Sequence, residues 1–338
     1  MEEVAPRPVL AIDLGGTQIR AAHISPDRTI SCRRAVPTHD EEGVEAVIGR
    51  ICRLAGEVLD AARDAGLSPP VGVGISAPGP LDQRAGVVIA PPNLRGWQHV
   101  PLARLVEERL RLPTFLERDT NVAVMAEWRH GAAQDADDVV YVTVSTGIGG
   151  GLVIDGRPLY GKDGAAGEIG HLTVDLDGPV DGDGGPGHVE AIASGTGIEN
   201  AARDLLGAGR APGLAALVTG PDDVTAELVA RAADEGDADC RAVLDRAAEA
   251  LGATLAGLVN LLNPEVIVIG GGIAEHRPQL IEAARAEIER RSFPIPARRV
   301  RLERPRFAGD VSLVGSLPIV NERMNHAAAG GHRSKEDV

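Results

Sequence analysis

Apolar residues in this chain recur with two periods, one typical of buried strands and one typical of amphipathic helices. The β-branched runs at residues 9–25 and 29–36 predict the first strands, and residues 43–65 have apolar positions at helical spacing. The same alternation continues along the chain and predicts an α/β fold. We expect further strands at 71–75, 113–117, 140–144 and 266–269, and further helices at 101–111, 122–131, 189–206, 223–235 and 237–262.

Length and charge narrow the class of protein. With 338 residues the chain exceeds the size at which one hydrophobic core keeps growing, so we expect two domains. The net charge of −15 argues against a nucleic-acid partner, because binding to a phosphate backbone depends on clustered cations. The chain has no apolar run of membrane-spanning length, and its first residues do not resemble a signal peptide. We therefore expect a cytoplasmic protein with no membrane partner.

The most distinctive pattern is a strand that breaks into hydroxyl residues and glycines and then resumes as a strand. It occurs as DLGGT at residues 13–17 and as STGIGGG at residues 145–151. Such turns expose backbone N–H groups beside hydroxyls and bind anions, phosphate above all. A single Gly-Gly hairpin is equally typical of an ordinary sheet. Two such turns in the two halves of one chain indicate a nucleoside triphosphate held from both sides.

Other nucleotide motifs fit these turns poorly. Neither turn has the Lys-Ser/Thr pair of a Walker A loop, and neither has the strand-then-helix order of a dinucleotide fingerprint. A third glycine turn at residues 270–272 does follow a predicted strand and enter a helix, which is an arrangement that approaches a nucleotide.

Asp119 follows the strand at 113–117 and begins the next helix. At that position it lies beside unpaired N–H groups and the positive end of the helix dipole. Those surroundings suit a helix N-cap as well as a chemical role, so both interpretations of Asp119 stay open on this residue alone. The irregular loops at 76–82 and 90–97 are rich in proline and glycine, and the first follows a strand end where α/β sheets place ligand contacts.

The two glycine turns, Asp119, the segment from Glu168 to His171 and the glycines at 270–272 occur in an order that resembles the ROK family of sugar kinases and sugar-responsive repressors. The likeness runs from about residue 9 to about residue 320, and the most specific match is residues 168–171 followed by residues 187–191. It implies two actin-like ATPase (ribonuclease H-like) α/β domains around a central cleft. We expect a first domain at 1–120 completed by a returning helix at about 311–325, a second at 121–310, and a frayed tail at 326–338.

The resemblance also implies roles for the matching residues. Asp119 would be the catalytic base that accepts the proton of the sugar 6-hydroxyl as the phosphoryl group passes. The implied cofactors are ATP and Mg²⁺, with Asp13 facing the metal through water. The residues expected at ATP are Asp13, Gly15, Gly16, Thr17, Thr146, Gly147, Gly271 and Gly272, and those expected at the hexose are Gly79, Asn93, Arg118, Asp119, Glu168, His171 and Glu190.

This chain departs from the family at a metal site. Many members bind a structural Zn²⁺ through the equivalent of His171 and three cysteines, but those cysteine positions here are Asp181, Asp183 and His188. These side chains retain oxygen and nitrogen atoms able to ligate zinc. A solvated Gly/Asp loop without metal is the simpler account, and we expect no bound metal. Another partner must then hold the His171 ring.

A second departure is Arg118, which stands where the family usually has Asn before the catalytic Asp. Arginine donates hydrogen bonds but cannot accept them, so it cannot make the same contacts with a sugar hydroxyl. Either that hydroxyl is recognised differently, or Arg118 turns to a carboxylate such as Glu117 or Glu127.

Together these features predict an ATP-dependent hexokinase, with glucose as the first candidate substrate. A kinase for N-acetylglucosamine or N-acetylmannosamine is the alternative enzyme. A non-catalytic sugar sensor is the alternative of another class, although a sensor needs no general base such as Asp119. Repressors of the family have a helix-turn-helix domain before the first glycine turn, and this chain reaches Asp13 without room for one. The resemblance further implies a homodimer.

Overall fold

The computed structural model describes residues 5–330, with side chains described as far as residue 326. The chain divides into two compact units. The first unit contains the chain up to residue 134, residues 160–166 and the segment from 306 onward, and the second contains residues 135–159 and 167–305. The first unit thus extends beyond the expected limit at residue 120, because the helix after Asp119 packs within it.

The first unit is built on a mixed five-stranded sheet with the order β3-β2-β1-β4-β7. Strands β1, β2 and β3 pair antiparallel, whereas β1, β4 and β7 are parallel neighbours. Its strands are β1 (Val9–Leu14), β2 (Gln18–Ile24), β3 (Ile30–Pro37), β4 (Val73–Ala77) and β7 (Thr114–Arg118), with a separate pair β5 (Leu81–Asp82) and β6 (Val87–Val88).

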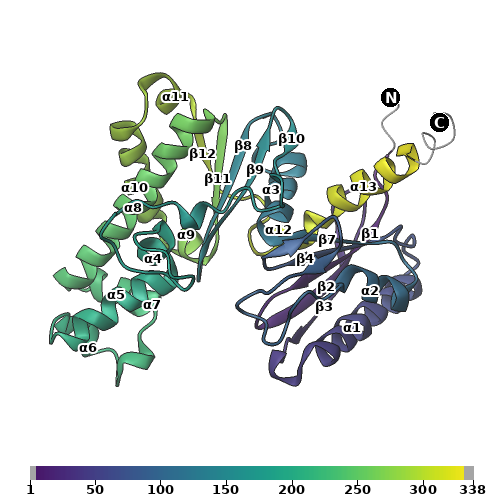
Figure 1. Ribbon diagram of the computed structural model, residues 1–338, viewed down its shortest axis with the longest axis horizontal. Coiled ribbons are helices and arrows are strands. Elements are labelled where there is room, and N and C mark those ends of the chain that lie inside the picture. The colour runs from purple at the N-terminus through teal and green to yellow at the C-terminus, as the bar shows by residue number, and fades with distance from the viewer. Residues whose placement is uncertain (1–4, 331–338) are drawn as a thin grey trace. The chain divides into compact units, whose positions relative to one another are not determined.

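Helices cover both faces of this sheet (Figure 1). Side chains alternate along a strand, so Leu10 and Ile12 of β1 join the core under α1 and α2, while Val9 and Ala11 join the one under α12 and α13. Glycine at position 74 lets α13 approach β4, because a Cβ there would lie 2.7 Å from Ser316 Cβ. The helices are α1 (Val44–Asp64), α2 (Leu102–Leu110), α3 (Asp119–His130), α12 (Val311–Val314) and α13 (Ser316–Gly330), with short 3₁₀ helices η1 (Asp40–Glu42) and η4 (Ala308–Asp310).

The second unit repeats the same strand arrangement without a shared sequence. Its sheet has the order β10-β9-β8-β11-β12, with β8, β9 and β10 antiparallel and β8, β11 and β12 parallel. The strands are β8 (Val139–Val144), β9 (Ile148–Ile154), β10 (Arg157–Pro158), β11 (Val266–Gly270) and β12 (Arg301–Glu303).

Helices form the remainder of the second unit and its apolar core. They are α4 (Val189–Ala193), α5 (Gly195–Gly207), α6 (Pro212–Ala215), α7 (Ala226–Asp234), α8 (Ala238–Leu262), α9 (Gly272–His276), α10 (Pro278–Arg291) and α11 (Pro294–Arg299), with 3₁₀ helices η2 (Ile169–His171) and η3 (Pro221–Asp223).

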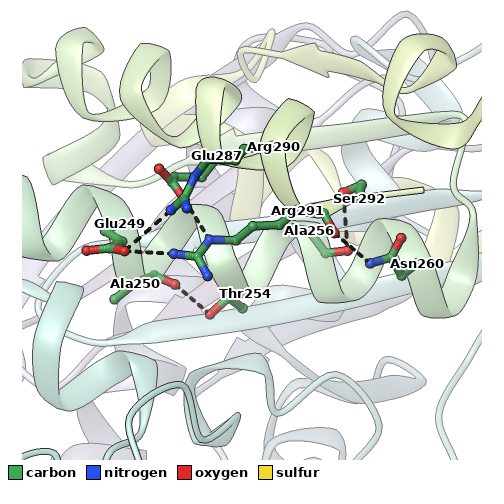
Figure 2. Close-up of polar contacts among 9 residues, drawn as sticks. All are labelled: Glu249, Ala250, Thr254, Ala256, Asn260, Glu287, Arg290, Arg291 and Ser292. Carbon is green, nitrogen blue, oxygen red and sulfur yellow. Dashed lines mark hydrogen bonds and ion pairs between the residues drawn. The ribbon is translucent and has the colours of Figure 1, made fainter. Parts of the chain in front are cut away.

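Close packing joins α8 to α10. A Cβ on Gly252 would lie 2.3 Å from Glu287 Cβ, so glycine is what allows this approach. Figure 2 shows Arg290 and Arg291 of α10 reaching Glu249 of α8, at 3.5 and 2.7 Å. The Arg290 and Glu249 side chains are 58% and 59% exposed, and such ion pairs contribute only about 0–1 kcal/mol. Buried apolar contact therefore holds the two helices together.

Two expectations about helices need correction. The helix expected at 189–206 is interrupted at Ser194, which has an extended backbone and caps α5 by accepting the Gly197 N–H at 3.0 Å. The expected frayed tail at 326–338 is helical as far as Gly330, and its remaining residues lie outside the described part of the chain. Within residues 5–330, none of the helices combines the length and apolar character needed to cross a bilayer.

Asp237 fixes the beginning of the longest helix. Its Oδ1 accepts the N–H groups of Asp239 and Cys240, and its Oδ2 accepts those of Gly213 and Leu214. Burial opposes ionisation of this carboxyl, but the four hydrogen bonds hold the pKa of Asp237 below its usual value. One side chain therefore caps α8 and ties the α6 segment to it.

We expect Asp237→Ala to lower the free energy of unfolding by about 1–3 kcal/mol, because buried N–H groups lose their acceptor. Because the native pKa is depressed, this contribution is present above the ordinary carboxyl pKa of about 3.9 and is lost as the pH falls through the native pKa. Urea denaturation of wild type and variant at several pH values measures the difference. Asp222→Ala, at an exposed position of η3, is the control. Equal stabilities at pH 7 would contradict the assignment.

Candidate functional site

In the first unit, the candidate residues lie at the carboxyl ends of three parallel strands. Asp13 of β1, Ser76 of β4 and Glu117 of β7 occupy one row of the sheet. The first glycine turn follows β1, the loop containing Gly79 follows β4, and Asp119 follows β7. The parallel pairing thus brings together three segments that are far apart in the sequence, at the edge where such sheets bind ligands.

The first glycine turn is tight and braced by its neighbours. The Gly15 N–H donates to the Gln18 carbonyl at 3.0 Å, and buried Thr38 donates its hydroxyl to the Gly15 carbonyl and its N–H to the Thr17 carbonyl. A Cβ at Gly16 would lie 2.8 Å from the Asn93 carbonyl oxygen. Asn93, expected at the sugar, therefore lies directly against the turn expected at the phosphates.

Asp13 at the end of β1 is paired with Arg20 of β2. Arg20 Nε and Nη2 both donate to Asp13 Oδ2, at 2.9 and 2.6 Å. Within the described part of the chain, no hydrogen bond reaches the other oxygen, Oδ1. That donor set fits the expected Mg²⁺ role, because Mg²⁺ keeps most of its water and uses one or two carboxylates.

Asp119 is exposed at the first residue of α3, and its Oδ1 accepts the Thr120 N–H at 2.7 Å. Directly behind it lies Glu117, which is 1% exposed. Glu117 accepts the Asn121 amide at 2.9 Å and the Arg118 N–H at 3.0 Å, and it forms an ion pair with Arg323 of α13. This carboxylate thus holds the beginning of α3 from inside.

Burial raises the pKa of Glu117, and the Arg323 charge and the hydrogen bonds from Asn121 and Arg118 oppose that rise. The Glu117 carboxylate also affects the pKa of Tyr160, which lies in the first unit. Burial and the negative charge of Glu117 raise the pKa of Tyr160 to about 12. Removal of Arg323 would therefore leave the buried Glu117 carboxylate without its ion-pair partner.

Arg118 is buried, and its Nη2 donates to the Ala166 carbonyl. Its aliphatic stem lies against Gly79, where a Cβ would be 3.4 Å from Arg118 Cδ. The two carboxylates considered as partners of the Arg118 guanidinium group are engaged by other groups. Glu117 is paired with Arg323, and Glu127 accepts the N–H groups of Ala132, Arg306 and Phe307.

In the second unit, the second and third glycine turns lie together. The Ser145 N–H donates to the Gly147 carbonyl at 2.9 Å, which closes the turn between β8 and β9. Gly271 has a φ of 96°. A Cβ on it would lie 2.5 Å from the Val144 carbonyl oxygen, so only glycine suits that position. The end of β11 is thereby packed against the end of β8.

A cavity of about 650 Å³ opens beside these turns. Thr146 and Gly272, both expected at ATP, line it together with the start of α5 at Gly195 and Thr196. The first N–H groups of α5 are already hydrogen-bonded, to the Ser145, Thr146 and Ser194 carbonyls and to the Ser194 hydroxyl, so the helix offers an anion its positive dipole end rather than free N–H groups. The wall also includes residues of α5, α7 and α9 and of the caps of α7 and α9 that the sequence did not single out, namely Glu199, Thr225, Arg231, Asp234, His276 and Arg277.

Glu190 connects the second glycine turn to the loop expected at the sugar. Its Oε2 accepts the Ile148 N–H at 2.7 Å, and a Cβ on Gly147 would lie 2.6 Å from that oxygen. Gly170, between Glu168 and His171, packs so closely that a Cβ would lie 2.2 Å from the Ile148 carbonyl oxygen. The Glu168 carbonyl accepts the His171 N–H at 3.2 Å and closes this segment.

His171 is held by two side chains from the loop that replaces the cysteines. Its Nδ1 lies 3.3 Å from His188 Nδ1 and 3.4 Å from Asp181 Oδ2, and His188 Nδ1 lies 2.6 Å from the same oxygen. Burial opposes ionisation of Asp181, but the His188 hydrogen bond and the N–H groups of Gly185 and Asp183 hold the pKa of Asp181 below its usual value. These contacts hold the His171 ring against the loop.

The arrangement does not fit the four-ligand zinc site of the family. His171, Asp181 and His188 gather within 4.8 Å, but Asp183 reaches the opposite ring nitrogen of His171, at 3.5 Å from Nε2. Tetrahedral ligands about 2.0–2.1 Å from one metal are separated by roughly 3.3 Å, longer than the 2.6 Å between Asp181 and His188. We describe the cluster as hydrogen-bonded and assign no chemical step to a metal there.

Sequence reasoning missed the groups that support the expected residues. Glu117 and Arg323 are 206 positions apart, so only folding shows their pairing. Glu117 did carry one local signal, since it is a carboxylate within an apolar strand immediately before Asp119. Arg20 carried a similar signal, because antiparallel pairing across a short turn places it opposite Asp13.

Comparison with known proteins gives a consistent result. The model of the ROK family matches residues 9–323. A glucokinase of Thermotoga maritima is 33% identical over 316 residues, which cover 94% of this chain and 98% of that protein. An N-acetylmannosamine kinase of Salmonella typhi is 35% identical over 309 residues, which cover 91% of this chain and 96% of that protein.

Among solved structures, the ROK family glucokinase from Streptomyces griseus in complex with glucose and AMPPNP has a TM-score of 0.77 at 30% identity. The match covers 93% of this chain and 99% of that one. The predicted α/β fold of two actin-like ATPase domains is confirmed by this likeness and by the repeated sheet order.

The hydrogen-bonded cluster around His171 generates a prediction. Asp181→Ala removes the acceptor shared by His188 and two backbone N–H groups, so we expect the melting temperature to fall by about 2–10 °C. Treatment of the wild type with EDTA should leave it unchanged. Differential scanning calorimetry with metal analysis checks both, and Asp177→Ala, at an exposed position of the same loop, is the control. Stoichiometric metal, or an EDTA effect as large as that of Asp181→Ala, would contradict this account.

Proposed function

Because the chain belongs to the ROK family, we propose that it is an ATP-dependent glucokinase, which transfers the γ-phosphoryl group of ATP to the 6-hydroxyl of glucose. The glucokinase relatives at 33% and 31% identity support glucose as the sugar. The complex of the Streptomyces griseus enzyme with glucose and AMPPNP supports ATP as the donor.

The observation that carries the proposal is the position of Asp119. An exposed carboxylate begins α3 at the carboxyl end of β7, and buried Glu117 fixes the backbone behind it. A carboxylate within hydrogen-bond reach of a sugar hydroxyl accepts its proton as the phosphoryl group is transferred. A protein that only binds sugar has no need of such a base. Asp119 therefore supports a kinase over a sensor.

Each unit contributes a turn suited to phosphate. In the first unit the turn at Gly15, Gly16 and Thr17 offers backbone N–H groups beside Asp13, and in the second the turn at Thr146 and Gly147 borders the 650 Å³ cavity. We assign the nucleoside to that cavity, with Gly271 and Gly272 at its edge. Mg²⁺, bound through Asp13, would neutralise phosphate charge as transfer proceeds.

The residues proposed to contact the sugar are assigned within each unit by itself. They are Gly79, Asn93 and Arg118 in the first unit, and Glu168, His171 and Glu190 in the second. Every buried hydroxyl left unpaired costs about 1–3 kcal/mol, so a sugar site needs several such donors and acceptors. The hydrogen bonds that fix His171 and Glu190 are consistent with a prepared site.

An N-acetylmannosamine kinase is the second candidate, favoured by the 35% identity to the Salmonella typhi enzyme. The two candidates differ in the group at the sugar 2-position, and therefore in which sugar has the higher kcat/KM. The proposal further includes a homodimer in the cytoplasm that has no nucleic-acid or membrane partner. The net charge of −15 supports the exclusion of nucleic acid.

We expect Asp119→Asn to lower kcat for glucose phosphorylation by about 10²- to 10⁴-fold, because asparagine keeps the size of the side chain but cannot accept the proton. The KM values for glucose and ATP should change little, since binding groups are retained. A coupled assay of ADP release measures all three constants.

The matched control is Asp60→Asn, on the exposed surface of α1, which should keep wild-type rates. An Asp119→Asn enzyme with full kcat would overturn the assignment of the base. A change confined to KM would instead make Asp119 a binding residue.

A further inference from the structure

Arg20 lies directly opposite Asp13 in the antiparallel pair of β1 and β2. It donates two hydrogen bonds, from Nε at 2.9 Å and from Nη2 at 2.6 Å, and both end on Asp13 Oδ2. The side chains are 20% and 15% exposed, so this pair is far less screened by solvent than the surface ion pairs of the molecule. Such a contact restricts the carboxylate to one orientation.

Arg20 is itself held from a third side. Its remaining nitrogen, Nη1, donates to the Gly309 carbonyl at 2.6 Å and lies 3.9 Å from Asp310 Oδ1. Arg33 of β3 contacts the same Asp310 oxygen at 2.7 Å. All three guanidinium nitrogens of Arg20 therefore have a partner. Through Gly309, η4 holds the Arg20 side chain, which in turn holds Asp13. The turn before α12 is in this way connected to the first glycine turn.

We propose that Arg20 is a positioning residue that sets the affinity of the enzyme for magnesium-bound nucleotide. It holds Oδ2 of Asp13 and leaves Oδ1 for a magnesium-bound water. This inference rests on the proposed function, because it requires Asp13 to face Mg²⁺. It concerns Arg20, to which neither the family resemblance nor the glycine motif gave a role.

Two effects of Arg20 on the metal oppose each other. Its positive charge repels Mg²⁺, whereas its two hydrogen bonds, which converge on Asp13 Oδ2, orient the carboxylate that receives the hydrated ion. Mg²⁺ requires near-ideal octahedral geometry and keeps several waters. We therefore expect the orienting effect of Arg20 on Asp13 to outweigh the repulsion between the Arg20 charge and Mg²⁺. Partners that orient a side chain bonded directly to a metal change metal affinity about 10- to 100-fold when removed, and a partner of a carboxylate that acts through water should have an effect at the lower end of that range.

The experiment compares the binding of ADP with and without Mg²⁺ by isothermal titration calorimetry. Arg20→Met removes the charge and both hydrogen bonds, and Arg20→Lys keeps the charge but cannot donate from two parallel N–H groups. We expect both variants to bind ADP with Mg²⁺ about 10-fold more weakly, with metal-free ADP affected much less. Arg33→Met, which leaves the contacts of Asp13 intact, is the control and should resemble the wild type.

The outcomes separate this inference from the proposed function. If wild-type protein binds ADP equally with and without Mg²⁺, the magnesium role of Asp13 fails. If the wild type depends on Mg²⁺ and Arg20→Lys behaves like it, only the positioning role of Arg20 fails. Tighter binding of ADP with Mg²⁺ by Arg20→Met would show that charge repulsion dominates, and would overturn the positioning role. Equal losses of ADP affinity with and without Mg²⁺ would overturn that role as well. Circular dichroism establishes that each variant is folded, and Arg20→Lys decides the question if Arg20→Met is not.

Discussion

At several glycines of the candidate site, the backbone lies closer to a neighbouring group than a residue with a Cβ atom would permit. The arrangement of the site depends on that constraint. A Cβ at Gly16 would lie 2.8 Å from the Asn93 carbonyl oxygen, and one at Gly147 would lie 2.6 Å from Glu190 Oε2. At Gly271 both the φ of 96° and the closeness of the Val144 carbonyl exclude other residues. Each glycine brings a loop expected at the ligand into contact with a strand end, and leaves N–H groups available to phosphate.

Carboxylates and their partners supply the second layer of the site. Glu117 braces the beginning of α3 behind Asp119, and Arg20 fixes Asp13, which lies two strands away in the same row of the sheet. In the second unit, Glu190 fixes the N–H of Ile148 after the glycine turn. Hydrogen bonds to a charged group are stronger than those between neutral groups, so each of these contacts keeps its neighbour in one place.

Local sequence was sufficient to predict the parts of the fold that depend on short-range pattern. The two glycine turns and the helix beginning at Asp119 were predicted, because alternation and turn residues act over a few positions. The strand expected at 71–75 is instead β4 (Val73–Ala77), which runs two residues into the loop expected at 76–82. Ser194 also acts locally, yet its capping of α5 was missed within one long helical pattern, and the predicted helix 189–206 is wrong at that residue. The roles of the site residues themselves remain predictions.

Long-range contacts could not be predicted in the same way. The pairing of Glu117 with Arg323, and the Ala166 carbonyl that receives Arg118, join segments that only the folded chain brings together. The cluster of His171, Asp181 and His188 was recognised as a possible metal set, but its hydrogen bonding depends on how the loop at 175–187 closes. The sugar side is therefore where sequence reasoning was weakest.

The proposed reaction is transfer of the γ-phosphoryl group of ATP to the 6-hydroxyl of a hexose. The most direct test incubates the protein with MgATP and ¹³C-labelled glucose and follows ADP release and the sugar product by NMR, with 6-deoxyglucose and N-acetylmannosamine in parallel. A glucokinase should give glucose 6-phosphate and ADP in equal amounts, less turnover with N-acetylmannosamine, and none with 6-deoxyglucose. Sugar binding without any phosphorylated product, or phosphate on another hydroxyl, would contradict the proposed reaction.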